Sequence, residues 1–139
     1  MASANRFEAF SEHLCEGVHN LDTGVIRAYL SNTTPDLAAD AVKADLAEIS
    51  AGNGYTAGGE DTLNATSRTG AVTSITATDI TWTASGGTIG PFRWLVHYND
   101  TPTSPADPLL FNWDYGSAIT LQIGEQFVAD YTTTQFTVG

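Results

Sequence analysis

The chain has 139 residues and a formal net charge of −11 at pH 7, which suits one soluble domain. Its five lysines and arginines are scattered, so no basic patch is present for nucleic acid or for an anionic membrane. We find no apolar run of about 20 residues, no signal peptide and only one cysteine, so we expect a protein made in a reducing cytoplasm.

We predict a single domain over residues 1–139, with an N-terminal helix in residues 1–19 and a β-rich body in residues 20–139. The helix itself is expected over residues 3–18, with Ser3 as its N-cap. Its apolar stripe is formed by residues three and four positions apart, namely Phe7, Phe10, Leu14 and Val18. Such a stripe docks onto the body of the domain or, alternatively, onto a neighbouring subunit.

A strand is predicted from Val25 to Leu30, followed by one short inserted helix that begins at Thr34-Pro35. This helix is expected over residues 36–44, while residues 45–49 fit either its continuation or a strand. The loop over residues 50–61 is rich in glycine but lacks the Lys-Ser/Thr ending of a phosphate-binding loop. We expect this loop to contact a neighbouring subunit.

From residue 62 onward the pattern is entirely β. Short segments of alternating or apolar residues, separated by turn residues, predict an antiparallel β-sandwich or barrel-like domain. Gly124-Glu125 predicts a hairpin turn between two of these segments. The predicted strands are Ala71 to Thr76, Asp79 to Thr83, Phe92 to Tyr98, Leu109 to Asp114, Ile119 to Ile123, Gln126 to Tyr131 and Gln135 to Val138.

The most informative of these strands is Phe92 to Tyr98, which follows a glycine-rich turn. Side chains alternate along an extended backbone, so Phe92 and Trp94 are expected on one face. Leu95 and His97 are expected on the other. Both faces are partly apolar, which predicts a strand in the middle of a sandwich.

No set of residues carries a strong catalytic or metal-binding signal. His97 has Asp79 and Asp100 as conceivable partners, but the chain has no Gly-x-Ser-x-Gly elbow, and packing of this histidine among aromatics is favoured. Cys15 and His19 lie four positions apart on the predicted helix, but no further ligands for zinc accompany them. We expect Cys15 to fill an apolar space, and we predict no metal and no cofactor.

Oxygen-rich loops and scattered acids offer weaker alternatives. Glu60-Asp61 and Asn99-Asp100-Thr101 fit calcium by residue type but lack its usual ligand spacing. A pair of carboxylates for glycoside hydrolysis would have to come from acids such as Asp107, Asp114 and Asp130, which we interpret as solvated surface.

Six aromatic residues raise the alternative of a sugar-stacking platform. They are Trp82, Trp94, Trp113, Tyr98, Tyr115 and Tyr131. Strand aromatics that alternate with polar residues are more often part of a core, which is the interpretation that we favour.

Four motifs resemble those of small structural virion proteins of tailed bacteriophages. In order they read Gly-Asn-Gly-Tyr-Thr-Ala-Gly-Gly from Gly52, Thr-Ala-Ser-Gly-Gly-Thr-Ile-Gly-Pro-Phe-Arg from Thr83, Tyr-Asn-Asp-Thr from Tyr98 and Trp-Asp-Tyr-Gly-Ser from Trp113. The segment from Val25 to Thr33 is similar as well, so the resemblance covers most of residues 20–131.

The resemblance implies a virion component that is not an enzyme and has no catalytic residues. We expect a capsid decoration protein that binds the major capsid protein on the capsid surface, as a homo-oligomer with a trimer favoured. The alternatives are a tail or neck component and a receptor- or glycan-binding module. The predicted contact residues are Phe7, Phe10, Leu14, Asn53 and Tyr55.

Overall fold

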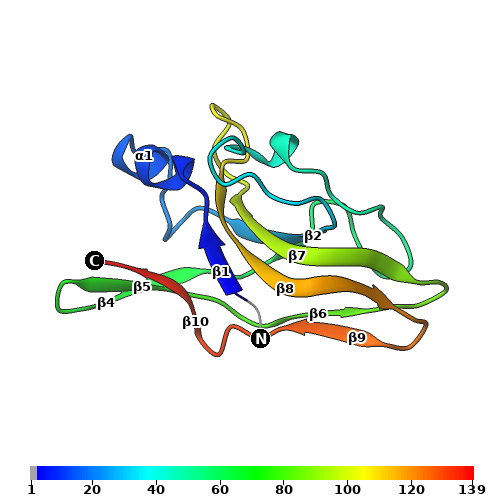
Figure 1. The fold of residues 1–139 in the computed structure, drawn as a ribbon. Helices are drawn as coiled ribbons and strands as arrows, with labels where there is room; N and C mark the ends of the chain where they lie inside the picture. Colours follow the sequence, from blue (N-terminus) through cyan, green and yellow to red (C-terminus); the bar gives the residue numbers. More distant parts are fainter. Residues whose placement is uncertain (1–2) are drawn as a thin grey trace.

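A five-stranded antiparallel sheet forms the middle of the structure (Figure 1), a computed structural model that describes residues 3–139. The two longest strands, β7 and β8, lie at its centre, and the short strands β1 and β3 form its edges. In spatial order the strands are β1 (Ser3–Arg6), β8 (Leu109–Leu121), β7 (Ile89–Asn99), β2 (Ile26–Ser31) and β3 (Glu60–Asp61).

Two smaller sheets together form a second layer below the first (Figure 1). One has the order β10-β5-β4 and the other pairs β6 with β9. The two sheets lie end to end, because β5 leads into β6 and β9 leads into β10. Between them, the Ala77 N–H donates to the Thr133 carbonyl. Their bounds are β4 (Ala65–Thr69), β5 (Val72–Thr76), β6 (Ile80–Thr83), β9 (Gln126–Ala129) and β10 (Thr134–Val138). The predicted mainly β, antiparallel fold is confirmed.

The N-terminal helix is much shorter than predicted. Residues Ser3–Arg6 form β1, which pairs with β8 from Ser3 opposite Asp114 to Arg6 opposite Phe111. The helix α1 covers only Ala9–Cys15. A helix of this length has little stability of its own, so the pairing of β1 with a long neighbouring strand decides the local structure.

The inserted helix over residues 36–44 does not form, and residues 45–49 form neither a helix nor a strand, apart from one 3₁₀ turn at Lys43–Asp45. The reason lies in two aspartates. The Asp36 carboxylate accepts the N–H groups of Ala38 and Ala39, and the Asp45 carboxylate accepts those of Ala41 and Val42. These short-range hydrogen bonds compete with the helical ones and favour turns.

The predicted strands agree with the observed β2, β5, β6, β7, β9 and β10 to within a few residues. The two strands predicted over residues 109–123 are one strand, β8, whose pairing with β7 is irregular around Gly116. The polar strands β3 and β4 have no counterpart among the predictions.

The hairpin predicted at Gly124-Glu125 is wrong, although the chain does turn there. β8 pairs with β7 and β1, whereas β9 pairs with β6 in the other layer. The turn therefore carries the chain from one layer to the next. Leu121 before the turn and Ala129 after it pack in the same cluster between the layers. Burial of these two residues favours the change from one layer to the other.

β7 is buried on both faces, as predicted, but its side chains are distributed between the two faces in a different way. Phe92 and Leu95 pack between the two layers, in a cluster that includes Trp82. Trp94 packs on the opposite face of the sheet, in a cluster with Tyr29. The predicted alternation placed Phe92 with Trp94, and an irregularity in the pairing with β8 between these two residues shifts the pattern.

Leu95→Ala tests the importance of the two-faced strand. Leu95 is completely buried at the centre of the sheet, so its truncation should lower the free energy of unfolding by about 2–5 kcal/mol. Ile123, which is 68% exposed in the turn after β8, provides the control. Ile123→Ala should change stability by less than about 0.5 kcal/mol in urea denaturation. Equal effects of the two substitutions would contradict this assignment of the core.

Candidate interaction surface

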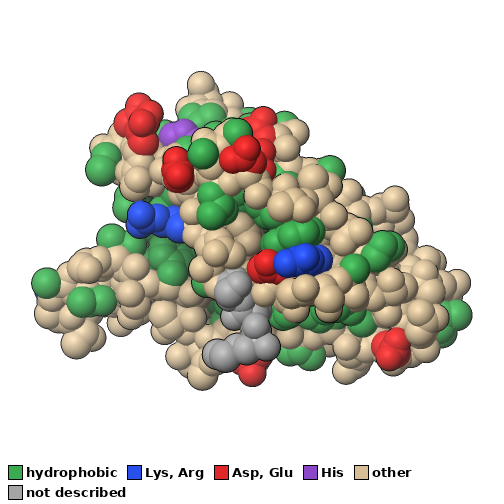
Figure 2. Space-filling view, viewed as in Figure 1, with side chains coloured by type: hydrophobic (Ala, Val, Ile, Leu, Met, Phe, Trp, Pro, Cys, Tyr) green, Lys and Arg blue, Asp and Glu red, His purple; other side chains and the backbone are tan. Residues whose placement is uncertain are grey.

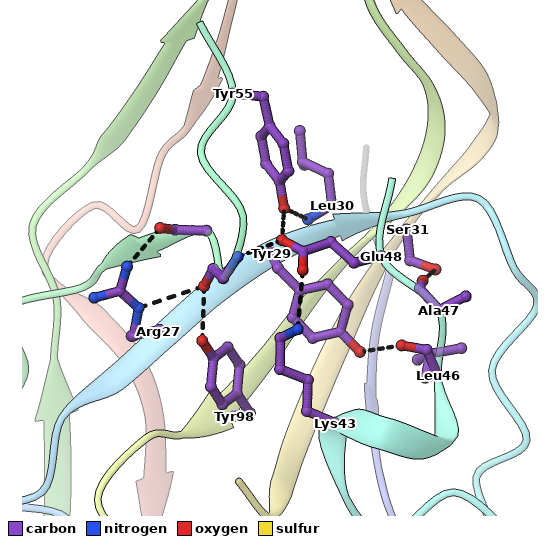
Figure 3. A network of polar contacts seen from close by, with 12 residues as sticks. Arg27, Tyr29, Leu30, Ser31, Lys43, Leu46, Ala47, Glu48, Tyr55 and Tyr98 are labelled. Atoms are coloured by element: carbon purple, nitrogen blue, oxygen red, sulfur yellow. Dashed lines mark hydrogen bonds and ion pairs between the residues drawn. The ribbon is translucent and has the colours of Figure 1, made fainter. Parts of the chain in front are cut away.

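The glycine-rich loop is bound to the body of its own chain through Glu48 (Figure 3). One carboxylate oxygen accepts the Tyr55 hydroxyl at 2.6 Å and the Gly58 N–H at 2.7 Å. The other forms an ion pair of 2.9 Å with Lys43. The Tyr55 hydroxyl in turn accepts the Leu30 N–H of β2, so this loop is anchored to the central sheet.

A second set of contacts holds the end of the loop. The Arg27 side chain donates to the Gly59 carbonyl at 2.7 Å, and the Tyr98 hydroxyl donates to the Gly58 carbonyl at 2.7 Å (Figure 3). Gly59 has a φ of +70°, and a Cβ there would collide with the backbone of Ala28. Close packing within the chain therefore explains the glycine at position 59. Residues 50–54 of the loop are exposed, and their contact with a neighbouring subunit stays a prediction.

Three of the five predicted contact residues are buried within the chain. Phe7, Phe10 and Tyr55 are 0%, 4% and 2% exposed. Phe7 and Tyr55 therefore have no side-chain surface for a partner, and Phe10 has only a small one, which lines a pocket beside α1. Leu14 is half-buried on α1. Asn53 is exposed, with its amide donating to the Thr88 carbonyl at 3.0 Å. Of the predicted set, Leu14 and Asn53 are accessible to a partner, and Phe10 is accessible only through that pocket. Their contact with a partner stays a prediction.

His97 connects the two layers of the fold. It is fully buried on β7, its ring stacks on Phe111 with centroids 3.9 Å apart, and its Nε2 lies 2.7 Å from the Tyr131 hydroxyl just beyond β9. Burial lowers the pKa of His97 to about 3, so the ring is neutral in the folded protein. The predicted packing of this histidine among aromatics is confirmed.

The second buried histidine, His19, lies beside His13. The His13 and His19 ring centroids are 6.1 Å apart, and His19 Nδ1 is 3.1 Å from the Asn99 amide nitrogen. Burial, together with His13, lowers the pKa of His19 to about 4. Cys15 is exposed, so its predicted role as an apolar filler is wrong. Among residues 3–139, no three His, Cys, Asp or Glu side chains gather as a metal site.

The acids considered for hydrolysis make separate local contacts. Asp114 forms a two-pronged ion pair with Arg93, at 2.8 and 3.0 Å. Asp130 caps a turn by accepting the Thr132 N–H. Burial and the nearby Asp100 raise the pKa of Asp107. These contacts position loops and strand ends and do not bring the three carboxylates to one site.

The aromatic residues considered for sugar binding are mostly core residues. Trp82, Trp94, Tyr98 and Tyr131 are between 1% and 7% exposed. Trp113 and Tyr115 are half-buried and pack against the cluster between the layers. The interpretation of these aromatics as core is confirmed for the four buried residues, and the remaining two pack against the same core.

A groove opens where the two layers diverge, beside α1. It consists of two adjoining pockets of about 370 and 500 Å³, which share Leu14 of α1 and Val138 of β10 as lining residues. We call it the α1 groove. Figure 2 shows the molecule hollowed between α1 and the β4–β5 hairpin, with hydrophobic side chains inside the hollow. No sequence pattern indicates this groove, because it joins segments from both ends of the chain.

The floor of the α1 groove is aromatic. Phe136 of β10 meets Phe10 edge-on, with ring centroids 5.7 Å apart, and meets Phe111 at 5.4 Å. Its walls are the strands β1 and β10 and the exposed side of α1 at Ser11. This combination of an apolar floor with two backbone walls is suited to binding an extended polypeptide segment.

Comparison with known proteins finds no matching family model, no matching curated protein and no matching solved structure. No helix within residues 3–139 is long and apolar enough to cross a membrane.

Glu48→Ala tests whether the glycine-rich loop is held by its own chain. The substitution leaves the Tyr55 hydroxyl, the Gly58 N–H and Lys43 without their shared acceptor, so stability should fall by about 2–4 kcal/mol. Chymotrypsin should then cleave after Tyr55 under native conditions. Glu12→Ala on the exposed side of α1 is the matched control and should leave Tyr55 protected. Continued protection of Tyr55 in Glu48→Ala would show that the network does not hold the loop.

The buried histidines predict a loss of stability in mild acid. Their pKa values in the folded protein, about 3 for His97 and about 4 for His19, lie below the value of about 6.5 for an unfolded chain. The unfolded state therefore binds more protons, and stability should fall as the pH drops from 6.5 towards 4. Each histidine should contribute a slope of up to about 1.4 kcal/mol per pH unit.

Urea denaturation at several pH values between 7 and 4.5 measures this slope. His97→Gln and His19→Gln should each reduce it by the contribution of one proton, whatever their effect on absolute stability. An unchanged slope in both variants would assign the acid sensitivity to other groups.

Proposed function

We propose that this chain is a non-enzymatic structural protein of a tailed-bacteriophage virion, and specifically a decoration protein that binds the assembled capsid. It would be made in the host cytoplasm and carried on the capsid surface. Its binding partner would be the major capsid protein, and it would bind as a homo-oligomer, with a trimer favoured.

The resemblance of four motifs to small virion proteins supports this proposal. The contacts of three side chains that could act as acids or bases support it as well. His97, Glu48 and Asp114 all make contacts that stabilise the fold, namely a link between the layers, a loop anchor and an ion pair. A protein that acts by binding requires a stable body of this kind and an open surface for its partner.

The α1 groove is the observation that carries the proposal. Its apolar floor includes Phe136 and Leu14, which are only partly buried within the chain. An apolar hollow of this kind, walled by exposed backbone, is a feature of protein-binding surfaces. Binding to many identical copies on a lattice requires only modest affinity at each site, because an oligomer adds avidity.

Co-sedimentation with particles of the phage that encodes the chain tests the proposal. The purified protein should pellet with expanded empty capsids at micromolar concentration, with saturation at a fixed number of copies for each capsid. It should also raise the temperature at which the shells rupture, because a ligand of the assembled state stabilises that state.

An unrelated protein of similar size and charge serves as the control and should stay in the supernatant. Failure of the chain to pellet with mature shells would overturn the proposal. Labelling of the tail or neck in electron micrographs, or sixfold rings of the free protein, would favour the tail or neck alternative.

A further inference from the structure

Asn112 of β8 is a buried polar side chain whose hydrogen-bonding groups are not used within the chain. The residue is only 1% exposed, and neither its amide oxygen nor its amide nitrogen has a hydrogen-bond partner among residues 3–139. Buried polar groups in folded proteins are almost always paired, because an unpaired amide has given up its hydrogen bonds to water. An exception of this kind indicates a partner from outside the chain, such as a water molecule or a ligand.

The amide lies on the face of the central sheet that is turned away from the second layer. Side chains alternate along β8, and the neighbours Phe111 and Trp113 pack in a cluster that includes Ile75 of β5. Asn112 is therefore directed to the other face. There it lies opposite Val96 of β7, which packs in the cluster that includes Trp94. Because Phe111 lines the α1 groove, Asn112 belongs to a different site.

A pocket of about 270 Å³ borders this part of the sheet, near the lower end of the range for small-molecule sites. The three strands β1, β8 and β7 provide one side of it, and the segment after β2 provides the other. Asn112 is the most deeply buried residue of the lining. The lining residues are Asn5, Thr34, Pro35, Leu37, Arg93, Trp94, Asn112 and Asp114.

The charges in this pocket neutralise one another. Among its described lining residues only Arg93 and Asp114 are charged, and two hydrogen bonds of 2.8 and 3.0 Å join them. A close pair of opposite charges attracts an ion only weakly, so a charged ligand is not favoured. A purely apolar ligand is not suitable either, because it would leave the Asn112 amide unpaired. The complementary ligand is uncharged and polar.

The chemistry of the amide narrows the class of ligand. Asn112 offers two N–H donors and one carbonyl acceptor in a single plane. Neighbouring hydroxyls of a sugar ring match this set, because each hydroxyl both donates and accepts. Further hydroxyls would find the Thr34 hydroxyl and the Asp114 carboxylate, and the C–H surface of the ring would contact Leu37. A peptide amide can pair with Asn112 but has no hydroxyls for these other polar groups.

We propose that this pocket binds a single sugar ring through neighbouring hydroxyls, with Asn112 as its main hydrogen-bonding residue. The inference goes beyond the proposed function and does not depend on it, since it uses the other face of the central sheet and does not involve the capsid protein. Its failure would leave the decoration role standing, and failure of the chain to bind capsids would leave the sugar site standing.

Titration of the nitrogen-15-labelled wild type tests the proposal, because the Asn112 side-chain amide gives its own signal. The probes are glucose, galactose, mannose and rhamnose. At least one of them should shift this signal and the Thr34 backbone amide, with a Kd of about 1–10 mM, which suits a ligand of about twelve heavy atoms. If none of the four gives saturable shifts at these positions, or if the shifts spread over the whole surface, the proposal is wrong.

Asn112→Leu removes both hydrogen-bonding groups and keeps a side chain of similar size. Binding of the sugar should weaken by about tenfold or more, while the temperature of unfolding should stay the same or rise, because no hydrogen bond within the chain is lost. Asn32→Leu, at an exposed position after β2 outside the pocket, is the matched control and should change binding less than about twofold. Equal binding by Asn112→Leu and the wild type would overturn the proposal. If Asn112→Leu does not fold, the titration of the wild type still decides.

Two further probes define the ligand. Acetamide, which carries the amide group of a peptide without hydroxyls, should leave the Asn112 signal unchanged at concentrations that saturate with sugar. An equal shift with acetamide would assign the pocket to amides and overturn the sugar site. Methyl glycosides of the sugars that bind distinguish two sources of the ring, since retained binding indicates the end of a glycan and lost binding indicates a free monosaccharide.

Discussion

The fold depends on a central sheet that is buried on both faces. Leu95 of β7 packs against the lower layer, while Trp94 and Tyr98 pack in the cluster that includes Tyr29 and Leu46 on the other face. A sheet with two apolar faces needs a cover on each side. The second layer of strands provides one cover. The segment between β2 and β3, which forms only a short 3₁₀ turn, provides the other.

An irregular cover must be held by specific contacts, and the polar network around Glu48 supplies them. Lys43 pairs with Glu48 and lies 4.8 Å from the centre of the Tyr29 ring. The Tyr29 hydroxyl donates to the Leu46 carbonyl, so the cover and the sheet are joined at several points. His97 performs a corresponding role between the layers. Glu48 and His97 therefore make contacts within the protein that hold its layers together. The α1 groove remains open to a partner.

Much of the β structure follows from local sequence, since alternating apolar residues located six of the strands to within a few residues. The failures occur where distant segments decide. Ser3–Arg6 carries no strong strand signal and becomes a strand because the edge of β8 that faces away from β7 offers it a partner. Phe92 changes faces because the pairing of β7 with β8 is irregular, which no alternation pattern reveals.

The candidate site was less predictable than the fold. Glycine is typical of positions where two backbones approach closely, and the backbone next to Gly59 is Ala28 of the same chain. Tyr55 looked like an exposed contact residue, and its burial depends on a hydrogen bond to Glu48, seven positions earlier in the chain. The α1 groove joins α1 with β10 across almost the whole sequence, so only the folded structure brings its walls together.

An electron cryomicroscopy map of the virion, at a resolution that traces the backbone, tests the central claim most directly. The account predicts this chain on the outer surface of the shell, with the α1 groove covered by the capsid protein. A map in which the α1 groove faces solvent while another surface of the chain contacts the shell would contradict it.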